Sequence, residues 1–333
     1  MRRLHRNIVV VVVLAFSARG AGPNRATAHP GHDDAPAGAG PAARNSSTLR
    51  VVSIADDDES ADAASHLTIT VRDGFRYVEA DGLPDHATGR FPNRGNPNSI
   101  RPQRYSFKTP TTPRRAERPV FVGGWVFGIG LNGVPFDPLT AEYLNGDRGS
   151  PWRYEAISPT LSLGLDANRA HVQPTGAYHY HGVPKGLVER RAATTRGLPV
   201  LLGYAADGYP IYTADAYRPV DEGTTSGAKP YRSRYRLKQG ARPTGPGNPG
   251  GSFDGTFGAD FEYVAGSGDL DECNGRSGPT PEYPEGTYYY VVTDEFPFVP
   301  RFFRGVPDES FAHAARRGPP PPRPFGRPRP PAF

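Results

Sequence analysis

Short apolar runs bounded by tight-turn residues limit what this chain can fold into more than any other feature. Residues 67–71, 200–204 and 288–292 are three such runs. Asn132-Gly133 and Asp207-Gly208 are typical of two-residue hairpin turns, because these residues tolerate the positive φ that the turn requires. The chain also contains 40 glycines and 38 prolines, and no segment of three or more turns shows helical periodicity. The sequence therefore argues against a helical bundle and predicts a mostly β domain.

The predicted domain is an antiparallel sandwich or barrel-like arrangement with long loops rich in glycine and proline. An α+β domain is the alternative, since loops of that length could contain short helices. The body of the chain also repeats itself, because residues 128–136 align with residues 203–211 and later blocks follow in the same order. We therefore predict two related halves, at about 120–185 and 198–305, with chance similarity between turns as the alternative.

The first 28 residues have the organisation of a secretory signal peptide. Three arginines within the first six residues precede a nine-residue apolar run, Ile8–Phe16, and residues 26–28 form an A-x-A cleavage site. Nine apolar residues are too few to cross a bilayer as a helix. We predict a mature chain that begins at His29, contains no transmembrane segment and is secreted or periplasmic. Which of these two destinations applies stays open.

Residues 29–47 and 316–333 differ in composition from the segment between them. The first segment is rich in alanine, glycine, proline and aspartate and is predicted to be a flexible linker. The second contains Pro319–Pro322 and five arginines and is predicted to be a disordered tail. Residues 48–315 remain as the predicted folded domain.

The distribution of charge argues against nucleic acid as a partner. The formal net charge is +5, but residues 1–28 and 316–333 each contain five arginines and no acidic residue. The chain between them therefore has a net charge of about −5, whereas a nucleic-acid-binding face needs an excess of lysine and arginine. The sequence also lacks a glycine-rich phosphate loop, a G-x-S-x-G elbow and an H-E-x-x-H motif. It therefore predicts no nucleotide cofactor and gives no support to the familiar serine-hydrolase and zincin mechanisms.

Three closely spaced histidines, His171, His179 and His181, carry the clearest chemical signal. Since successive side chains on a strand point to opposite faces, His179 and His181 would share one face, and Tyr178 and Tyr180 the other. Two imidazoles on one face can chelate a divalent metal ion such as zinc or copper, and His171 could fold back as a third ligand. The alternative is a structural strand whose imidazoles hydrogen-bond to neighbouring groups.

Two carboxylates are further candidates for this site. Asp166 could be a fourth metal ligand or an acceptor that orients an imidazole N–H, with a turn residue as the alternative. Glu272 is a candidate general base beside a metal-bound water, with a solvated surface group as the alternative. Cys273 is the only cysteine, so the chain has no intramolecular disulfide.

Four separated blocks, at residues 132–135, 176–181, 203–212 and 270–275, occur in a characteristic order. They resemble the YHYH domain family of exported proteins, which is named for the tetrapeptide found here at residues 178–181. The resemblance runs from about Gly128 to Gly305. It implies a domain type and an exported location, but no known reaction.

The chain departs from this family in two places. Where the family often repeats Tyr-His-Tyr-His, residues 288–291 read Tyr-Tyr-Tyr-Val. Where it often has a cysteine before a final aromatic-Arg-Gly, residues 300–305 have none. The resemblance therefore gives no support for a second metal site and leaves Cys273 without the family's usual disulfide partner.

Two classes of function stay open from the sequence. The first is an exported metal-binding domain whose histidines leave an open position for water, as in a metal-dependent hydrolase. The second is a non-catalytic module that uses exposed tyrosines to bind a carbohydrate or protein outside the cell. Converging histidines would favour the first class, and scattered histidines beside an aromatic groove the second. We favour metal binding and do not predict whether the protein is an enzyme, what extracellular ligand it takes or how it oligomerises.

Overall fold

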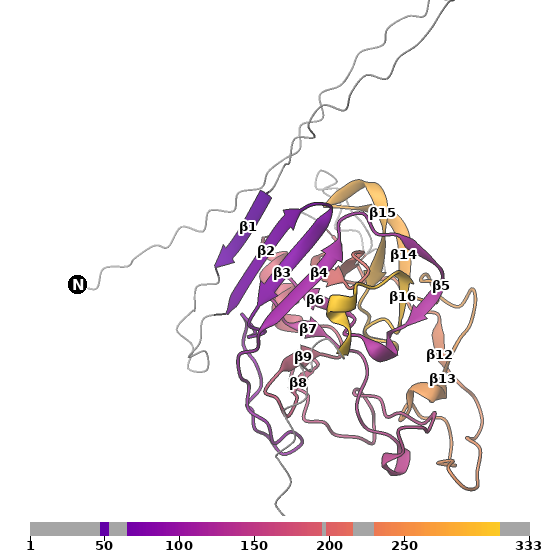
Figure 1. The fold of residues 1–333 in the computed structure, drawn as a ribbon. Coiled ribbons are helices and arrows are strands. Elements are labelled where there is room, and N and C mark those ends of the chain that lie inside the picture. The colour runs from indigo at the N-terminus through magenta and orange to yellow at the C-terminus, as the bar shows by residue number, and fades with distance from the viewer. Residues whose placement is uncertain (1–46, 53–64, 195–197, 216–229, 314–333) are drawn as a thin grey trace, which may run out of the picture. The chain divides into compact units, whose positions relative to one another are not determined.

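The structure, a computed structural model, describes residues 47–52, 65–194, 198–215 and 230–313 (Figure 1). All of them belong to one unit of the chain, Arg44–Phe333. The predicted signal peptide, nearly all of the predicted linker and the predicted tail lie outside the described residues. Within the described ranges, no helix is both long enough and apolar enough to span a membrane.

Two sheets contain most of the strands. The first is antiparallel, in the order β1-β2-β3-β4, and consists of β1 (Ser47–Val52), β2 (His66–Arg72), β3 (Phe75–Ala80) and β4 (Tyr105–Pro110). The second has eight strands in the order β14-β15-β11-β10-β6-β7-β9-β8. Its strands are β6 (Gly128–Gly130), β7 (Pro135–Phe136), β8 (Ala170–Val172), β9 (Tyr178–Tyr180), β10 (Leu201–Ala205), β11 (Pro210–Tyr212), β14 (Gly275–Thr280) and β15 (Tyr283–Val291).

Shorter elements complete the described residues. β12 (Tyr235–Leu237) pairs with β13 (Phe261–Tyr263), and β5 (Arg115–Phe121) pairs with β16 (Phe302–Gly305). The helices are α1 (Lys185–Ala192) and the 3-10 helices η1 (Val122–Gly124), η2 (Leu144–Gly146), η3 (Gly258–Asp260) and η4 (Glu309–Phe311).

The β2–β3 hairpin shows how local sequence sets the first sheet. Asp73 and Gly74 form its two-residue turn, with φ values of 51° and 78°, and a tight hairpin turn requires positive φ at both positions. Along β2, Leu67 and Ile69 are buried while the residues between and beside them are more exposed. Alternate side chains of this strand therefore face the core.

The second sheet is mixed rather than purely antiparallel. β7 pairs with β9 in parallel, and β11 pairs with β15 in parallel. A parallel pair needs a long crossover connection, and the segments between the paired strands span residues 137–177 and 213–282. Such a connection leaves no local signal in the sequence, so the prediction of an antiparallel arrangement was incomplete.

One buried cluster lies between the two sheets. It takes Leu67, Val78 and Phe107 from the first sheet and Ile129 and Tyr180 from the second. In Figure 1, β6 and β7 lie behind β3 and β4. Apolar side chains from two sheet faces that pack on each other form the core of a sandwich, and the prediction of a β-rich fold is confirmed. The α+β alternative is wrong, since α1 is the only α-helix among the described residues and has eight residues.

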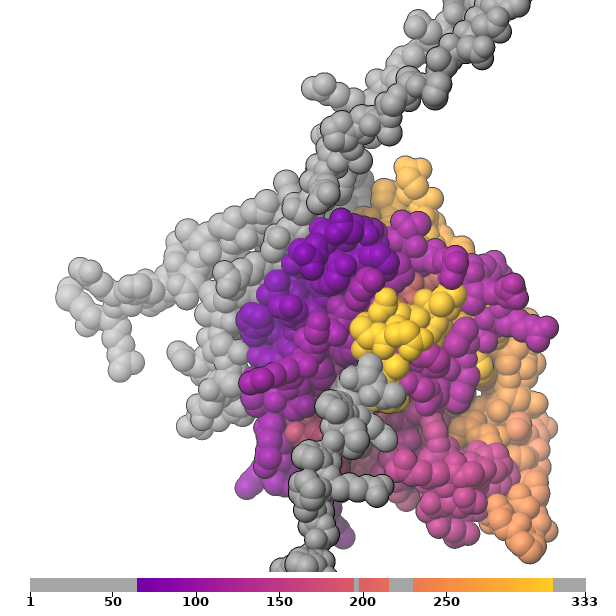
Figure 2. Space-filling view, in the orientation of Figure 1, coloured from indigo at the N-terminus to yellow at the C-terminus, as the bar shows by residue number. Residues whose placement is uncertain are grey.

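The end of the described chain closes this core. Phe311 in η4 is fully buried and stacks on Phe107 of β4, with ring centroids 4.2 Å apart. The backbone N–H of Lys108 donates to Ser310 Oγ at 2.9 Å. Figure 2 shows this segment in yellow against violet and magenta parts of the chain. The packing of the first sheet therefore depends on residues some 200 positions later in the chain, since Lys108 and Ser310 are 202 residues apart.

The second sheet has the same internal order when it is read from either edge. From one edge it runs β8-β9-β7-β6, from the other β14-β15-β11-β10, and β6 pairs with β10 in the middle. In each direction the pairings are antiparallel, parallel and antiparallel. A Cβ on Gly203 would lie 2.2 Å from the carbonyl oxygen of Ile129, so glycine is required where the two sets of strands meet. This order fits the two predicted halves, whose origin by duplication stays a prediction.

Asp207 and Asn132 occupy matching turns in the two sets of strands. Asn132 Nδ2 donates to the hydroxyl of Tyr180 at 2.8 Å. Asp207 Oδ2 instead accepts from the hydroxyl of Tyr290 at 2.5 Å and from the N–H of Gly305 at 2.8 Å. Burial raises the pKa of Asp207 to about 6, although these hydrogen bonds act in the opposite direction. As the pH rises, this carboxyl therefore ionises in the unfolded chain before it ionises in the native state.

We expect Asp207→Asn to flatten the dependence of stability on pH. Between about pH 4 and about pH 6 the unfolded chain holds fewer protons at this site than the native state, so the free energy of unfolding falls as pH rises. Asparagine cannot ionise, so the fall should shrink by on the order of 3 kcal/mol, and its amide oxygen can still accept from the Gly305 N–H. Urea denaturation across this range measures the effect, with the exposed Glu117→Gln as the control. The same slope in Asp207→Asn as in the parent would contradict it.

Candidate metal centre

β8 and β9 form an antiparallel hairpin that brings the three histidines together. His171 lies directly opposite His179 in the register of this pair. The chain reverses between Gln173 and Gly176, where the N–H of Gly176 donates to the carbonyl of Gln173 at 2.8 Å. Gly176 has a φ of 90°, which glycine adopts without strain. The turn sequence therefore explains why His171 folds back onto the strand that carries the other two histidines.

The two faces of this hairpin differ in chemistry. Tyr178 and Tyr180 point into the core between the sheets, where both are fully buried. The three histidines lie on the other face, with ring centroids 4.7 to 4.9 Å apart. His179 and His181 are only 3% and 2% exposed. The structure therefore contains the alternation of faces that the sequence predicts.

The histidine nitrogens converge to distances that suit metal coordination. One ring nitrogen from each of His171, His179 and His181 can be chosen so that all three lie within 4.8 Å of one another. Nε2 of His171 and Nε2 of His181 are 3.1 Å apart. Two imidazole nitrogens on one tetrahedral zinc ion would be about 3.3 Å apart, given zinc–nitrogen bonds of about 2.05 Å. The observed spacing is close to that value.

A backbone carbonyl lies beside Nδ1 of two of these rings. Nδ1 of His171 is 3.0 Å from the oxygen of Leu163, and Nδ1 of His179 is 3.3 Å from the oxygen of Ala177. A carbonyl oxygen cannot donate, so these nitrogens carry the proton and the lone pair lies on Nε2. Metal-bound imidazoles usually have such an acceptor on the nitrogen that does not bind the metal.

His181 is the ring whose hydrogen bonding is incomplete. Its Nε2 faces Nε2 of His171, which can only accept because the proton of His171 is on Nδ1. Its own Nδ1 is buried and makes no hydrogen bond of good geometry. The backbone of Pro138 also interacts with this ring and acts to raise its pKa. If the proton of neutral His181 is on Nε2, it can be donated to Nε2 of His171. Nδ1 of His181 then carries no proton.

The rings of His171 and His181 are neutral near pH 7. Burial lowers the pKa of His171. Burial also lowers the pKa of His181 well below its usual range, and the adjacent His179, His171 and Arg301 act in the same direction. Neutral imidazole is the form that binds a metal ion. These two rings therefore do not have to release a proton to solvent before they bind a metal ion.

Asp166, the fourth predicted ligand, lies away from this group. Its Oδ2 accepts from the hydroxyl of Tyr178 at 2.6 Å and from the N–H of Gly89 at 3.0 Å. Its Oδ1 accepts from the N–H groups of Asn168 and Ala170 at 2.8 and 3.3 Å. Since Tyr178 points to the core face, Asp166 lies on the face opposite to the histidines. The structure supports the alternative that Asp166 is a turn residue, because its oxygens hold the turn that precedes β8.

Glu272, the candidate general base, is also remote from the histidines. Its carboxylate pairs with Arg304 at 3.0 Å, and its side chain is 41% exposed. Glu272 precedes β14, which forms the opposite edge of the second sheet from β8. It therefore cannot act on a water held by the three histidines. The neighbouring Cys273 is buried and unbridged, and burial raises the pKa of its thiol, which does not suit a nucleophile.

Asp137 and Glu142 are carboxylates whose charges act on His171, and the sequence analysis missed both. The N–H of Asp137 donates to the carbonyl of Tyr180 at 3.0 Å, so the pairing of β7 with β9 continues one residue beyond β7. Phe136 packs on Tyr180 in the core, with ring centroids 5.2 Å apart. Because side chains alternate along the strand, Asp137 points to the histidine face. The sequence offered one signal, since Asp137 directly follows residues 128–136, the block that aligns with residues 203–211.

The same face of the matching strands has no histidine. Arg276 and Tyr289 form the pair that corresponds to His171 and His179, and Val291 corresponds to His181. Tyr289 and Val291 belong to a separate buried cluster with Leu201, Tyr212 and Leu270. Within the described residues, the only group of histidines or acids that could hold a metal ion is the one on β8 and β9.

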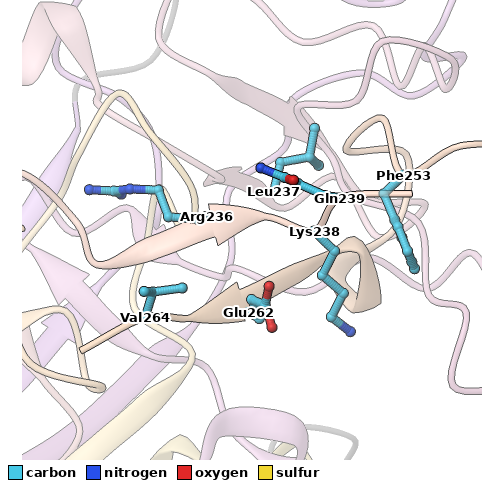
Figure 3. Close-up of a pocket in the computed structure, with 7 residues that line it drawn as sticks. All are labelled: Arg236, Leu237, Lys238, Gln239, Phe253, Glu262 and Val264. Carbon is cyan, nitrogen blue, oxygen red and sulfur yellow. The ribbon is translucent and has the colours of Figure 1, made fainter. Parts of the chain in front are cut away.

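A surface hollow elsewhere on the molecule has no contact with the histidines. It lies over the β12–β13 hairpin, has a volume of about 570 Å³ and is lined by residues that include Leu237, Lys238, Phe253 and Val264 (Figure 3). Its lining mixes charged and apolar side chains, and none of the three histidines is among them. The candidate centre and this hollow are therefore separate features.

Comparison with protein families gives one match. A family model described as "YHYH protein" matches residues 106–305, which is more than half of the 333 residues. The match confirms the resemblance drawn from the four sequence blocks. Neither the curated proteins nor the solved structures contain a match to this chain.

Proposed function

This chain belongs to the YHYH protein family, and we propose that it binds a divalent transition-metal ion through His171, His179 and His181. The observation that carries the proposal is the convergence of one nitrogen from each ring to within 4.8 Å of the others. Nδ1 of His181 is buried and has no hydrogen-bond partner, and such a group costs free energy. A bound ion would accept a lone pair from each ring at once.

The hydrogen bonds around His181 favour a metal ion over a purely structural role. Without an ion, a proton on Nε2 of His181 can be donated to Nε2 of His171. Nδ1 of His181 is then buried without a hydrogen bond. With an ion at Nε2 of both rings, the proton of His181 would move to Nδ1. All three rings would then bind the ion through Nε2, and Nδ1–H of His171 and of His179 would lie beside a backbone carbonyl, as is usual for metal-bound histidine.

Zinc and copper are the ions that this donor set suits best. Zinc takes three imidazoles and keeps a fourth position for water or another ligand. Copper(II) binds the same donors more tightly in general. Catalysis is not part of the proposal, because neither of the acids predicted from the sequence lies beside the histidines.

Metal analysis of the exported protein tests this proposal. We expect close to one equivalent of zinc or copper in protein purified from the exported fraction, whose N-terminus should read His29-Pro30-Gly31 after removal of the signal peptide. Addition of zinc to metal-free protein should raise its thermal stability, because an ion that binds the native state at 100 times its Kd adds about 2.7 kcal/mol. Metal-free protein that gains no stability and takes up no ion would contradict the proposal, and an intact Met1 would contradict export.

The alternative of a non-catalytic module with exposed tyrosines has less support. Among the described residues no tyrosine is exposed, and six are buried: Tyr105, Tyr178, Tyr180, Tyr212, Tyr289 and Tyr290. An aromatic groove of the kind that binds carbohydrate would need exposed rings. Six of the described tyrosines instead belong to the core and the others are half-buried, and metal binding is the better account of the histidine face.

A further inference from the structure

His171 lies on β8, the strand at one edge of the second sheet, which pairs only with β9. Near this residue the N–H of Gln173 donates to the carbonyl of Ala177 on the β9 side. Because inward and outward groups alternate along an antiparallel ladder, the carbonyl of Val172 points away from β9. No further strand holds this edge, so the position of His171 depends on what covers it.

Two asparagines from residues 81–104, the segment that connects β3 to β4, cover this edge. Nδ2 of Asn96 and Nδ2 of Asn98 both donate to the carbonyl of Val172, at 2.9 and 2.8 Å. Asn96 is itself buried, with 4% of its surface exposed. The residue that follows His171 is therefore fixed by two donors from a segment that comes before β8 in the chain.

A third asparagine of the same segment holds the acceptor of the His171 ring. Nδ1 of His171 is 3.0 Å from the carbonyl oxygen of Leu163, and Nδ2 of Asn93 donates to the carbonyl of the next residue, Gly164, at 2.9 Å. A Cβ on Gly164 would lie 2.2 Å from Oδ1 of Asn93, so the two residues pack without any free space. We call Asn93, Asn96 and Asn98 the asparagine clamp.

The clamp is rigid because its side-chain oxygens hold its own backbone. Oδ1 of Asn93 accepts from the N–H groups of Gly95 and Asn96 at 3.0 and 2.9 Å. Oδ1 of Asn96 accepts from the N–H of Asn98 at 3.1 Å. Asparagine forms such turns readily, since its short side chain reaches the backbone two residues on. The oxygens therefore fix the turn, and the nitrogens are left to donate to the two sides of His171.

The other half of the second sheet has the same turn before its edge strand, but not the clamp. Asp271 accepts from two N–H groups before β14, as Asp166 does before β8. Ser277 is the counterpart of Val172 in the register of the edge pair. Within the described part of the chain, no side chain donates to the carbonyl of Ser277. The fold of this edge therefore does not require a clamp, which occurs only where the edge carries a histidine.

We propose that the asparagine clamp positions His171 so that its Nε2 faces the metal ion. The inference rests on the proposed metal site. The clamp keeps the carbonyl of Leu163 beside Nδ1 of His171, so the ring proton stays on Nδ1 and the lone pair on Nε2. Asn93 is thus a positioning residue, because it acts on the ion only through the His171 ring.

Asn93→Ala tests this role, because it removes the donor to Gly164. Protonated and unprotonated ring nitrogens have well-separated 15N chemical shifts, so NMR of the metal-free protein reports the tautomer of His171. The signals of this ring are those missing from His171→Gln. We expect the parent to hold the proton on Nδ1 and Asn93→Ala to populate the Nε2–H form as well. Zinc affinity, measured by titration against a chelator, should fall about tenfold to a hundredfold.

Gln103→Ala is the matched control. Gln103 belongs to the same segment, and its Nε2 donates to the carbonyl of Thr175 in the β8–β9 turn at 3.3 Å. It makes no contact with Leu163 or Gly164, so the variant should keep the parental tautomer and a zinc affinity within about twofold of the parent.

Asn93→Asp is a second variant, for use if the alanine variant does not fold. Its carboxylate can still accept from the N–H groups of Gly95 and Asn96, but it cannot donate to Gly164. The same change of tautomer is expected. An added negative charge favours a nearby cation, so a loss of zinc affinity in this variant would not come from the charge.

The role of the clamp requires both changes. An Asn93→Ala protein with the parental tautomer, or with the parental zinc affinity, would overturn that role and leave the metal site standing. No zinc uptake by the parent would overturn the metal site, and the role of the clamp with it.

Discussion

The His179→Ala/His181→Ala variant is expected to lose its bound metal completely. It removes two of the three imidazoles that converge within 4.8 Å, and a single remaining imidazole at His171 does not hold a divalent ion at micromolar concentration. We expect the metal content to fall from close to one equivalent to background, and the affinity of the metal-free protein for zinc to fall by at least about a thousandfold. Elemental analysis and zinc titration followed by calorimetry measure these two quantities.

His86→Ala is the matched control for this variant. His86 lies on the other side of β9, where its Nε2 is 2.6 Å from the hydroxyl of Tyr180. His86 contacts the same strand, β9, but it does not belong to the group of three histidines whose nitrogens converge. We expect it to keep the bound metal, although removal of its ring leaves the Tyr180 hydroxyl with fewer partners. Equal metal content in the parent and in the double variant would leave the three histidines as structural residues.

The Arg301→Met variant is expected to lose about 3–5 kcal/mol of stability. Arg301 pairs with Glu155 at 2.6 Å, and the two side chains are 7% and 5% exposed. Burial raises the pKa of Glu155, and the charge of Arg301 opposes this rise. Methionine would leave the carboxyl buried without its cation, and would also remove the donor to the carbonyl of Pro138. Chemical denaturation of the metal-free protein measures the loss.

The double variant Glu155→Gln/Arg301→Met separates the ion pair from the packing around it. If the cost arises from an unpaired buried charge, the double variant should be more stable than Arg301→Met alone, because no charge is left without a partner. Glu155→Gln alone should also be destabilising, because it leaves the buried guanidinium of Arg301 without its anion, even though glutamine can still accept a hydrogen bond from it. A double variant that is as unstable as the sum of the two single variants would contradict this explanation.

Local sequence was sufficient for the strands and for the histidine face. The period-two alternation of Tyr178 to His181 separates the imidazoles from the core tyrosines, and it depends only on the geometry of an extended chain. The turn at Gln173 to Gly176 is likewise local, because Gly176 supplies the positive φ that the reversal requires. For these reasons the β-rich fold and the convergence of His171 with the other two histidines followed from residues close together in the chain.

Long-range pairing decided the acidic side of the site. Asp166 is five residues from His171 and appeared to be the natural carboxylate, yet the turn before β8 directs it to the core face. Asp137 is 44 residues from His181 and becomes its neighbour only because β7 pairs with β9 in parallel. Glu272 was chosen from its sequence block, and the order of the second sheet puts that block at the opposite edge.

What the sequence by itself determined is therefore each strand's two faces, the tight turns and the shared face of His179 and His181, because these depend on backbone geometry within a few residues. Only the tertiary structure decided that the large sheet is mixed, that Asp137 rather than Asp166 lies beside the imidazoles, and that Arg301 and Glu155 form a buried pair. Each of these depends on which distant strands pair and in which register, and crossover connections as long as residues 137–177 leave that choice without a local signal.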